Sequence, residues 1–475
     1  MVRTRFSPSP TGLIHIGNAR AALFSALYAA KENGAFLLRI EDTDLARSEQ
    51  KYTEMLQEDL HWLGINWQEG PGVGGPHQPY WQSQRRAIYD NYFQELENKK
   101  LAYACFCTEQ ELALNRKLQL SRGQPPRYPG TCRKLSAEEV ARRIASGLKP
   151  ALRFHVPEKT AVDFTDLVKG LQHFNSDDIG DFIIRRADGS ASFMFCNAID
   201  DSAMKISHVL RGDDHLANTP RQLMILKALD LPAPQYGHLS MITGDDGAPL
   251  SKRHGSSSLN DLHTQGYLPI AVLNYLSRLS HTYEQQELIS FQELATHFKI
   301  KKLSRAPARF DKNQLLHWQK EAAMRLDNAE TLAWLDIETV EKIPEIKRDL
   351  FAEVMRKNIL FPNEAHLWAE IFFGEQLQFT HEQIDLLKEA TEVFFVEAEI
   401  AVKKHGVDIK SICDELKAKL NISGKKLFMP LRIALTGEQN GPELVHIATL
   451  LGQEKMLQHF NHALELVRER DVASL

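Results

Sequence analysis

VRTRFSPSPTGLIHIGN, residues 2–18, opens with a short run of β-forming residues and then breaks at prolines and a glycine. A helical pattern follows from Asn18, and Gly34 stands where a glycine commonly ends a helix. The apolar run FLLRI, residues 36–40, predicts a second strand. Strand, turn, helix and strand in this order predict a parallel βαβ unit, in which ligands bind at the carboxyl ends of the strands.

The turn after the first strand contains neither GxxxxGK[ST] nor GxGxxG, the two common phosphate-binding motifs. It does place His15 and Gly17 at the start of the predicted helix. The backbone carries partial positive charge there, and a glycine lets a ligand approach closely. A structural turn with a surface histidine and a nucleotide-binding turn explain these residues equally well.

A second strand-to-helix junction is predicted within SHVLRGDDHLANTPRQLMILK, residues 207–227. Asn218 is the expected helix N-cap, and Pro220 falls in the first helical turn. Either a ligand site or a solvated loop explains the charged residues before this helix, which are Arg211, Asp213, Asp214 and His215.

The loop APLSKRHG, residues 248–255, follows an apolar stretch and brings together two adjacent cations, Lys252 and Arg253. A lysine in such a loop suits a clamp that neutralises the negative charge developing on transferring phosphates. An ordinary basic surface loop is the simpler interpretation when this motif is taken alone.

The composition limits the function only broadly. The 475 residues carry 57 Lys+Arg and 62 Asp+Glu, a net charge of −5, which gives no overall basic footprint of a nucleic-acid binder. No apolar run reaches the roughly 18–20 residues of a membrane span, and the N-terminus lacks the apolar core of a secretory signal, so we expect a cytoplasmic protein with no membrane partner. The five cysteines fit a reducing compartment. Cys196, in a strand-like apolar run, and Cys413, on a helical face, are expected in the core.

The two motifs PSPTGLIHIGN and PLSKR, in this order, resemble the signatures of the class I aminoacyl-tRNA synthetases. The PSPTG form before His15 resembles the bacterial-type glutamyl-tRNA synthetases. Two positions depart from the usual signatures, because Asn18 stands where His is usual and Pro249 where Lys is usual. The resemblance covers essentially the whole chain and includes RIEDTD (39–44), HVLRGDDHLANTPRQ (208–222) and GKKLFMPLRIALTG (424–437).

The resemblance implies an ATP site built on both signatures, with Mg²⁺ accompanying ATP. His15 and Lys252 would be the catalytic residues. No protein nucleophile is needed, because catalysis would rest on the alignment of substrates and on charge stabilisation. The expected ATP-binding residues are His15, Gly17, Asn18, Asp214, Lys252 and Arg253.

A glutamate site needs cations for two carboxylates and an acceptor for one ammonium group. Arginine forks grip carboxylates bidentately, and Arg5 and Arg211 are the cations available at the predicted sheet edge. Glu41 is the natural partner for the ammonium. Phe193 occupies a place where the family usually has Tyr, so one hydroxyl beside the substrate is missing. The resemblance assigns glutamate binding to Arg5, Ser9, Glu41, Phe193, Asn197 and Arg211.

A cysteine cluster in a loop-rich stretch resembles a tetrahedral zinc site. Some members of the wider family use a tyrosine as the fourth ligand, and others use a Cys or His just after the third cysteine. Arg133 and Lys134 occupy those latter places here, so tyrosine or water is left. Three reduced cysteines close together by chance are the alternative. The candidate ligands are Cys105, Cys107, Tyr128 and Cys132.

The expected fold is α/β: a Rossmann-type parallel-sheet catalytic domain with an α+β insertion, followed by an all-α anticodon-binding region. Helical periodicity runs from about residue 320 onward, with Asp408 as one N-cap and an amphipathic helical segment over 381–404. The expected boundaries are 1–104 and 190–243 for the catalytic halves, 105–189 for an acceptor-binding insertion, 244–320 for a stem-contact segment and 321–475 for the anticodon-binding domain.

The resemblance implies a monomeric glutamate–tRNA ligase. ATP would activate L-glutamate to glutamyl-adenylate, and the acyl group would pass to the 3′-terminal adenosine of tRNA(Glu). One alternative is relaxed or shifted specificity that charges tRNA(Gln). A second is an enzyme that glutamylates a modified anticodon base, which the helical region from residue 321 disfavours. A third is a paralogue that only binds RNA, which the presence of His15, Lys252 and Glu41 disfavours.

Overall fold

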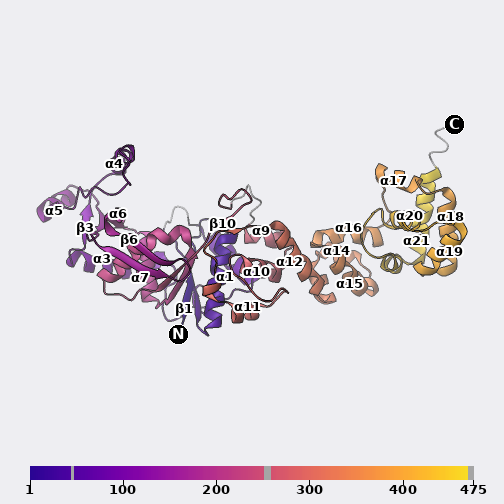
Figure 1. The fold of residues 1–475 in the computed structure, drawn as a ribbon, viewed down its shortest axis with the longest axis horizontal. Helices are drawn as coiled ribbons and strands as arrows, with labels where there is room; N and C mark the ends of the chain where they lie inside the picture. Colours follow the sequence, from indigo (N-terminus) through magenta and orange to yellow (C-terminus); the bar gives the residue numbers. More distant parts are fainter. Residues whose placement is uncertain (44–47, 251–257, 469–475) are drawn as a thin grey trace. The chain divides into compact units, whose positions relative to one another are not determined.

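The computed structural model describes residues 1–43, 48–250 and 258–468. The chain divides into two compact units, the first made of residues 1–264 with 269–315 and the second of residues 265–268 with 316–475. All strands formed by the described residues belong to the first unit, and the second unit is helical (Figure 1). Within these ranges, no helix is both long enough and apolar enough to cross a bilayer.

The predicted βαβ unit is present at the N-terminus. β1 (Arg3–Phe6) pairs in parallel with β2 (Ala35–Leu38), with Arg3 opposite Ala35, and α1 (Ile16–Lys31) connects them. Every residue of β2 is buried, as the continuous apolar run predicts. The loops after both strands therefore meet at one edge of the sheet.

The end of α1 differs from the prediction. Its C-cap is Glu32, and Asn33 rather than Gly34 adopts the left-handed conformation, with φ of 49°. Gly34 is required for a different reason, because a Cβ at this position would lie 2.2 Å from the carbonyl oxygen of Val2. The glycine thus permits close packing between the start of β2 and the N-terminus.

A second parallel pair forms the other half of the sheet. β8 (His208–Gly212) pairs with β9 (Gln235–Leu239), and α8 (Thr219–Ala228) connects them, with Asn218 at its N-cap as predicted. The N–H of Ser207 donates to the carbonyl of Arg3 at 2.9 Å, which joins this pair to β1.

Antiparallel elements lie between the two halves, as the predicted α+β insertion requires. β3, β4 and β7 form one three-stranded sheet, and β5 and β6 form a hairpin. The elements are β3 (Ala102–Cys105), α4 (Glu109–Ser121), α5 (Ala137–Ala145), β4 (Ala151–Phe154), β5 (Ala161–Asp166), β6 (Gly170–Asn175), α6 (Ser176–Ile179) and β7 (Phe182–Arg185).

α7 (Phe193–Ala203) contradicts the strand-like interpretation of the run around Cys196. Cys196 is fully buried, as predicted, but on a helix whose residues 195–202 are all buried. A continuous apolar run cannot distinguish a buried helix from a buried strand. The other elements of the first unit are α2 (Gln50–Trp62), α3 (Arg86–Asn98), β10 (Ile242–Thr243), α9 (Leu259–Thr264), α10 (Pro269–Arg278), α11 (Phe291–His297) and β11 (Ala308–Arg309).

The second unit is a helical bundle, as predicted. The segment 381–404 is helical as predicted and forms two helices, α17 and α18, with Thr391 at the N-cap position of the second. Asp408 caps α19 as expected, accepting from the N–H of Ser411 at 3.3 Å. The helices are α12 (Lys312–Arg325), α13 (Asn328–Trp334), α14 (Ile337–Lys342), α15 (Arg348–Asn358), α16 (Pro362–Phe373), α17 (His381–Lys388), α18 (Glu392–His405), α19 (Ile409–Leu420), α20 (Lys425–Thr436) and α21 (Leu444–Arg468).

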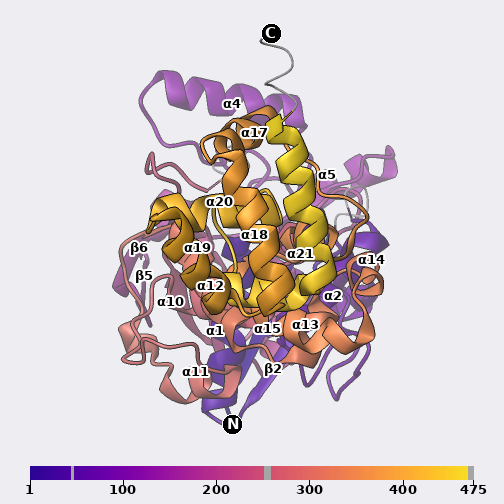
Figure 2. The same ribbon diagram turned by 90° about the vertical axis from the view of Figure 1, so that its right-hand side faces the viewer.

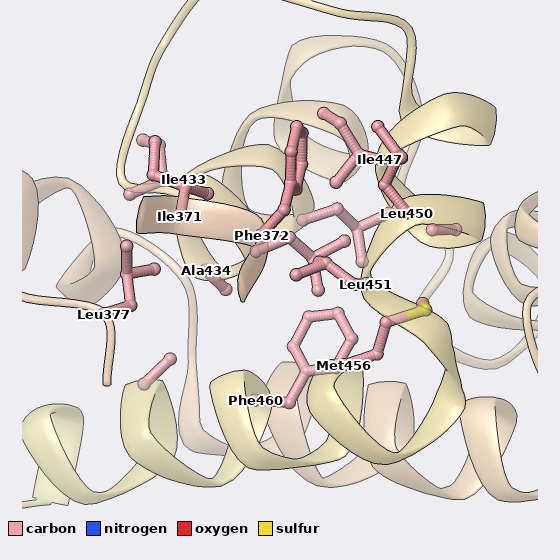
Figure 3. Packing of buried hydrophobic residues seen from close by; sticks show 14 of the residues in the cluster. Ile371, Phe372, Leu377, Ile433, Ala434, Ile447, Leu450, Leu451, Met456 and Phe460 are labelled. Carbon is pink, nitrogen blue, oxygen red and sulfur yellow. The ribbon is translucent and has the colours of Figure 1, made fainter. Parts of the chain in front are cut away.

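One apolar core holds this bundle together. Figure 3 shows Phe372 of α16 beside Leu450 and Leu451 of α21, with Met456 and Phe460 on the part of α21 that follows its kink at Gly452. α18 and α21 lie side by side (Figure 2). Cys413 belongs to this core, as its helical position predicts.

Phe395 of α18 is fully buried in the same core. Phe395→Ala should destabilise the second unit by about 3–5 kcal/mol, because it removes a large apolar side chain and leaves a cavity. Hydrogen exchange of peptides from α18 and α21 measures this loss. Val393→Ala, at a position 56% exposed on the same helix, is the matched control and should change exchange little. Equal effects of the two substitutions would contradict the described core.

Candidate functional site

A buried ion network joins β1 and the segment after β2 to α7. Arg39 is inaccessible to solvent, and its Nη2 lies 2.8 Å from Oδ1 of Asp201. The same oxygen accepts from Nε of Arg5 at 3.2 Å. Oδ1 of Asp200 accepts from Nε of Arg85 at 2.6 Å, and its Oδ2 lies 3.9 Å from Nε of Arg39. Three buried guanidinium groups thus share two carboxylates.

Arg39, Arg85, Asp200 and Asp201 were not among the predicted site residues. Arg39 directly follows the apolar strand β2, and the two aspartates follow the apolar run in α7. A charged side chain within an apolar run is the signal that could have identified them, because a buried charge requires a partner.

The first pocket is a cavity of about 230 Å³ at the carboxyl ends of β1 and β8. It brings together residues from four separate parts of the chain, between positions 5 and 215. All six residues predicted to bind glutamate line it: Arg5, Ser9, Glu41, Phe193, Asn197 and Arg211.

Arg211 is the buried cation of this pocket that has no ion pair among the described residues. Its Nη2 donates to Oγ1 of Thr219 and to Oε1 of Gln222, both at 2.8 Å. Within the described ranges, Nη1 is buried and has no hydrogen-bond partner. Burial lowers the pKa of Arg211 to about 10, so the group stays charged at neutral pH. An unpaired buried cation is costly, and an anion bound in the pocket would offset that cost.

Glu41 gives the same pocket a carboxylate. It is 8% exposed, and burial raises its pKa against the opposing effect of Arg39. Oγ of Ser9 donates to its Oε2 at 3.5 Å. Cationic and anionic groups thus face one small cavity, as an amino acid with charges of both signs requires.

Phe193 and Asn197 shape the wall of the pocket. The Phe193 ring stacks on His215 with a centroid distance of 5.3 Å. Nδ2 of Asn197 donates to the carbonyl of Phe193 at 3.2 Å, and its Oδ1 accepts from Nη2 of Arg39 at 2.9 Å. Asn197 therefore links the ion network to the aromatic wall.

The second pocket, of about 360 Å³, begins at the N-terminus of α1. It shares Asn18, Gly212 and His215 with the first pocket. A Cβ at Gly17 would meet no atom within 4 Å, so the glycine leaves space rather than serving internal packing. Of the predicted ATP-binding residues, the second pocket is lined by His15, Gly17, Asn18 and Asp214.

Lys252 and Arg253 lie outside the described residues. The residues on either side of them are held by main-chain hydrogen bonds. Leu250 N–H donates to the carbonyl of Ile242 at 3.0 Å, and Leu259 N–H donates to that of Ile14 at 3.0 Å. Ser258 forms a β-bridge with His15. Ser258 and Leu259, which follow the second predicted signature in the sequence, are thus joined to the first signature, and Pro249 and Leu250 line the second pocket.

The predicted cysteine cluster is assembled in the structure. The sulfur atoms of Cys105, Cys107 and Cys132 lie within 4.8 Å of one another. The hydroxyl of Tyr128 lies 3.4 Å from Sγ of Cys105 and 3.5 Å from Sγ of Cys107. Arg153 donates from Nε to Cys105 at 3.1 Å and covers the Tyr128 ring at 3.8 Å.

Comparison with known proteins agrees with this architecture. Residues 1–317 match the family model of the catalytic domain of class I tRNA synthetases (E and Q), and residues 328–464 match an anticodon binding domain. The chain belongs to the class I tRNA synthetases of the E and Q type. The predicted α/β fold with its helical C-terminal region is thereby confirmed. ATP and Mg²⁺ are general to this class.

The curated relatives match over their full length. A protein of Coxiella burnetii (strain RSA 331 / Henzerling II) named glutamate–tRNA ligase 2 is 51% identical, over 98% of this chain and 100% of its own length. One of the same name from Nitrosococcus oceani is 50% identical, over 98% of each chain. The crystal structure of a glutamate tRNA ligase from Elizabethkingia meningosepticum in complex with its amino acid is 28% identical, with a TM-score of 0.88 over 98% of this chain and 100% of that one.

Asp201→Asn tests the ion network. Because it leaves the buried Arg5 and Arg39 without their shared carboxylate, it should lower the free energy of unfolding by about 3–5 kcal/mol at pH 7. Burial raises the pKa of Asp201, but Arg5 and Arg39 lower it by more, so the net shift is downward. The wild-type advantage is therefore present above about pH 4, the usual aspartate value in unfolded chains, and shrinks as the pH falls further.

Urea unfolding at several pH values measures this advantage. Asp230→Asn removes an exposed partner of Lys99 and should cost about 1 kcal/mol or less. A loss for Asp201→Asn no larger than that of this control would contradict the network.

Proposed function

We propose that this chain is a glutamate–tRNA ligase, which activates L-glutamate with ATP and transfers it to tRNA(Glu). The observation that carries the proposal is the unpaired, buried Nη1 of Arg211 at a pocket that Arg5 and Glu41 also line. A carboxylate bound there gains a charge-assisted hydrogen bond. Where the side-chain carboxylate of glutamate is the group bound, glutamine offers only a neutral amide in its place, so the same cation favours glutamate over glutamine.

The two adjoining pockets would align the reactants. Glutamate occupies the first pocket and ATP the second, and the shared residues Asn18, Gly212 and His215 mark where the α-carboxylate meets the α-phosphorus. Attack gives glutamyl-adenylate and pyrophosphate, and the 3′-terminal hydroxyl of tRNA then takes the acyl group. His15 at the start of α1 and Lys252 would stabilise the phosphate charge.

The rest of the chain would position tRNA. We assign acceptor binding to residues 105–189, stem contact to residues 244–320 and anticodon binding to residues 321–475. The match of residues 328–464 to an anticodon binding domain supports the last assignment. It also argues against a glutamyl transferase that modifies an anticodon base and consists of the catalytic part alone. We place a monomer with this activity in the cytoplasm, where charged tRNA is consumed.

The cysteine cluster would hold a structural zinc ion. Tetrahedral Zn–S bonds of about 2.3 Å place sulfur atoms roughly 3.8 Å apart, and those of Cys107 and Cys132 lie 3.7 Å apart. Tyr128 is the one remaining donor among the predicted ligands. When bound, the ion would cross-link β3 to the loop around residue 130, and the chemistry of the reaction would not pass through it.

Aminoacylation assays test the proposal. The purified chain should charge tRNA(Glu) with glutamate, and tRNA(Gln) in the same assay measures relaxed specificity. Lys252→Ala should lower ATP–pyrophosphate exchange, measured with tRNA present, by about 100-fold or more, because a charge that stabilises the phosphates is lost.

Circular dichroism shows whether the variant is folded. Near-normal exchange in folded Lys252→Ala would remove the second signature from the mechanism. Charging of neither tRNA by the wild type would favour a protein that only binds RNA. If the wild type charged only tRNA(Gln), its partner would be tRNA(Gln) rather than tRNA(Glu).

Elemental analysis tests the zinc site. The purified protein should carry about one zinc per chain, and Cys132→Ser should lose most of it because a thiolate ligand is removed. Cys413→Ser, a substitution in the second unit, is the control and should keep the metal. Tyr128→Phe separates a tyrosine ligand from water as the fourth donor. A fully folded preparation without zinc would exclude a structural metal here.

A further inference from the structure

A buried hydrogen-bonded chain runs from the insertion to the first pocket. Oδ2 of Asp166, the last residue of β5, lies 2.6 Å from Nδ1 of His238 in β9. Nε2 of His238 accepts from Nε of Arg211 at 3.1 Å. The side chains of Asp166 and His238 have no solvent-accessible surface. This series of hydrogen bonds therefore ends at Arg211, whose Nη1 has no hydrogen-bond partner among the described residues.

The donor and acceptor roles in this series of hydrogen bonds are fixed by the chemistry of arginine. Because guanidinium nitrogens only donate, Nε2 of His238 must accept, and the ring proton must lie on Nδ1, facing Asp166. Oγ1 of Thr219, 3.1 Å from the same Nε2, can donate to it while accepting from Nη2 of Arg211. Burial lowers the pKa of His238, in keeping with a neutral ring. In a charged ring, Nε2 would also carry a proton, and this N–H donor would face the Nε–H donor of Arg211.

Asp166 is itself held firmly. Its Oδ1 accepts from the backbone N–H groups of Val168 at 2.9 Å, Lys169 at 2.8 Å and His238 at 3.2 Å. These bonds orient the carboxylate, so Oδ2 stays directed at the imidazole. The arrangement resembles the carboxylate–histidine pairs that orient metal ligands, with a guanidinium in place of the metal.

We infer that His238 and Asp166 are positioning residues for substrate recognition: they hold Nε of Arg211 so that Nη1 faces the carboxylate of the bound amino acid. The inference rests on the proposed function, since it concerns how the same pocket binds glutamate. With Nε held by His238 and Nη2 by Thr219 and Gln222, Nη1 is the guanidinium group left for the ligand. Neither residue lines the first pocket or was predicted from the sequence.

A purely structural role for the pair makes a different prediction. If Asp166 and His238 only fastened β5 to β9, their loss would lower stability and affect all kinetic constants alike. Positioning of Arg211 instead affects glutamate binding selectively, because the ATP pocket does not contain Arg211. The split between the KM values for glutamate and ATP separates the two roles.

Asp166→Asn is the decisive substitution. The asparagine oxygen can still accept from the three backbone N–H groups, while its amide now donates toward Nδ1 of His238. The ring proton must then move to Nε2, where it opposes the N–H of Arg211, as a wrong tautomer does in other Asp-to-Asn replacements. We expect the KM for glutamate to rise about tenfold or more. The KM for ATP should stay within about twofold of wild type.

A matched control lies on the same hairpin, which β5 and β6 form. Asp163 and His173 form an exposed carboxylate–histidine pair, with Oδ1 and Nδ1 2.5 Å apart. Asp163→Asn should leave both KM values unchanged. Calorimetric titration with glutamate provides a binding measurement that does not depend on turnover.

Two His238 variants keep the test decisive if Asp166→Asn does not fold. His238→Gln retains an acceptor for Nε of Arg211 and, since an amide can turn over, should keep the KM for glutamate within about threefold of wild type. His238→Leu removes the acceptor and should raise this KM about tenfold or more. Equal glutamate KM values for the two variants would overturn the inference, as would an unchanged KM in folded Asp166→Asn.

The outcomes also separate this inference from the proposed function. A wild-type chain that neither binds nor charges glutamate overturns both. A wild type that charges glutamate, together with a folded Asp166→Asn variant that binds it equally well, overturns the positioning role alone.

Discussion

Three buried guanidinium groups share two carboxylates where α7 packs against β1 and the segment after β2, and the rest of the site depends on this neutralisation. Arg5 comes from β1, Arg39 follows β2, Arg85 directly precedes α3, and Asp200 and Asp201 come from α7. Burial of any one of these charges alone would cost several kcal/mol. Together they fasten these four parts of the chain to one another. The walls of the first pocket are thus held by rigid elements rather than by loops alone.

Arg211 shows the opposite treatment of a buried charge. Its hydrogen-bond partners Thr219, Gln222 and His238 are neutral, and His238 in turn pairs with Asp166. Arg39 and Arg85 are therefore satisfied within the protein, Arg5 is paired with Asp201 and also lines the first pocket, and Arg211 keeps a guanidinium nitrogen without a hydrogen-bond partner among the described residues. In the proposed glutamate site, a carboxylate bound at Arg211 would offset a desolvation cost that the fold already bears, which is how a preorganised site gains selectivity.

Local signals in the sequence predicted much of the fold. The βαβ order, the caps at Asn218 and Asp408 and the helical second unit follow from turn residues and periodicity, which act over a few positions. The motif residues of the two pockets were also identified. The partners of Arg39 and Arg211 were not, because Asp200 and His238 lie 161 and 27 residues away along the chain, and no local pattern records such pairing. Apolar runs were ambiguous for a related reason, as the run around Cys196 shows.

The net charge of −5 is a weak guide to a partner as anionic as tRNA. Arg5, Arg39, Arg85 and Arg211 are all buried, so they contribute to amino-acid recognition or stability but little to steering at the surface. Phosphates must instead be met by local groups of exposed cations, where counterion release supplies the affinity. An acidic total then weakens binding to nucleic acid that does not fit those local surfaces. Overall acidity and specific tRNA binding are therefore compatible properties of one chain.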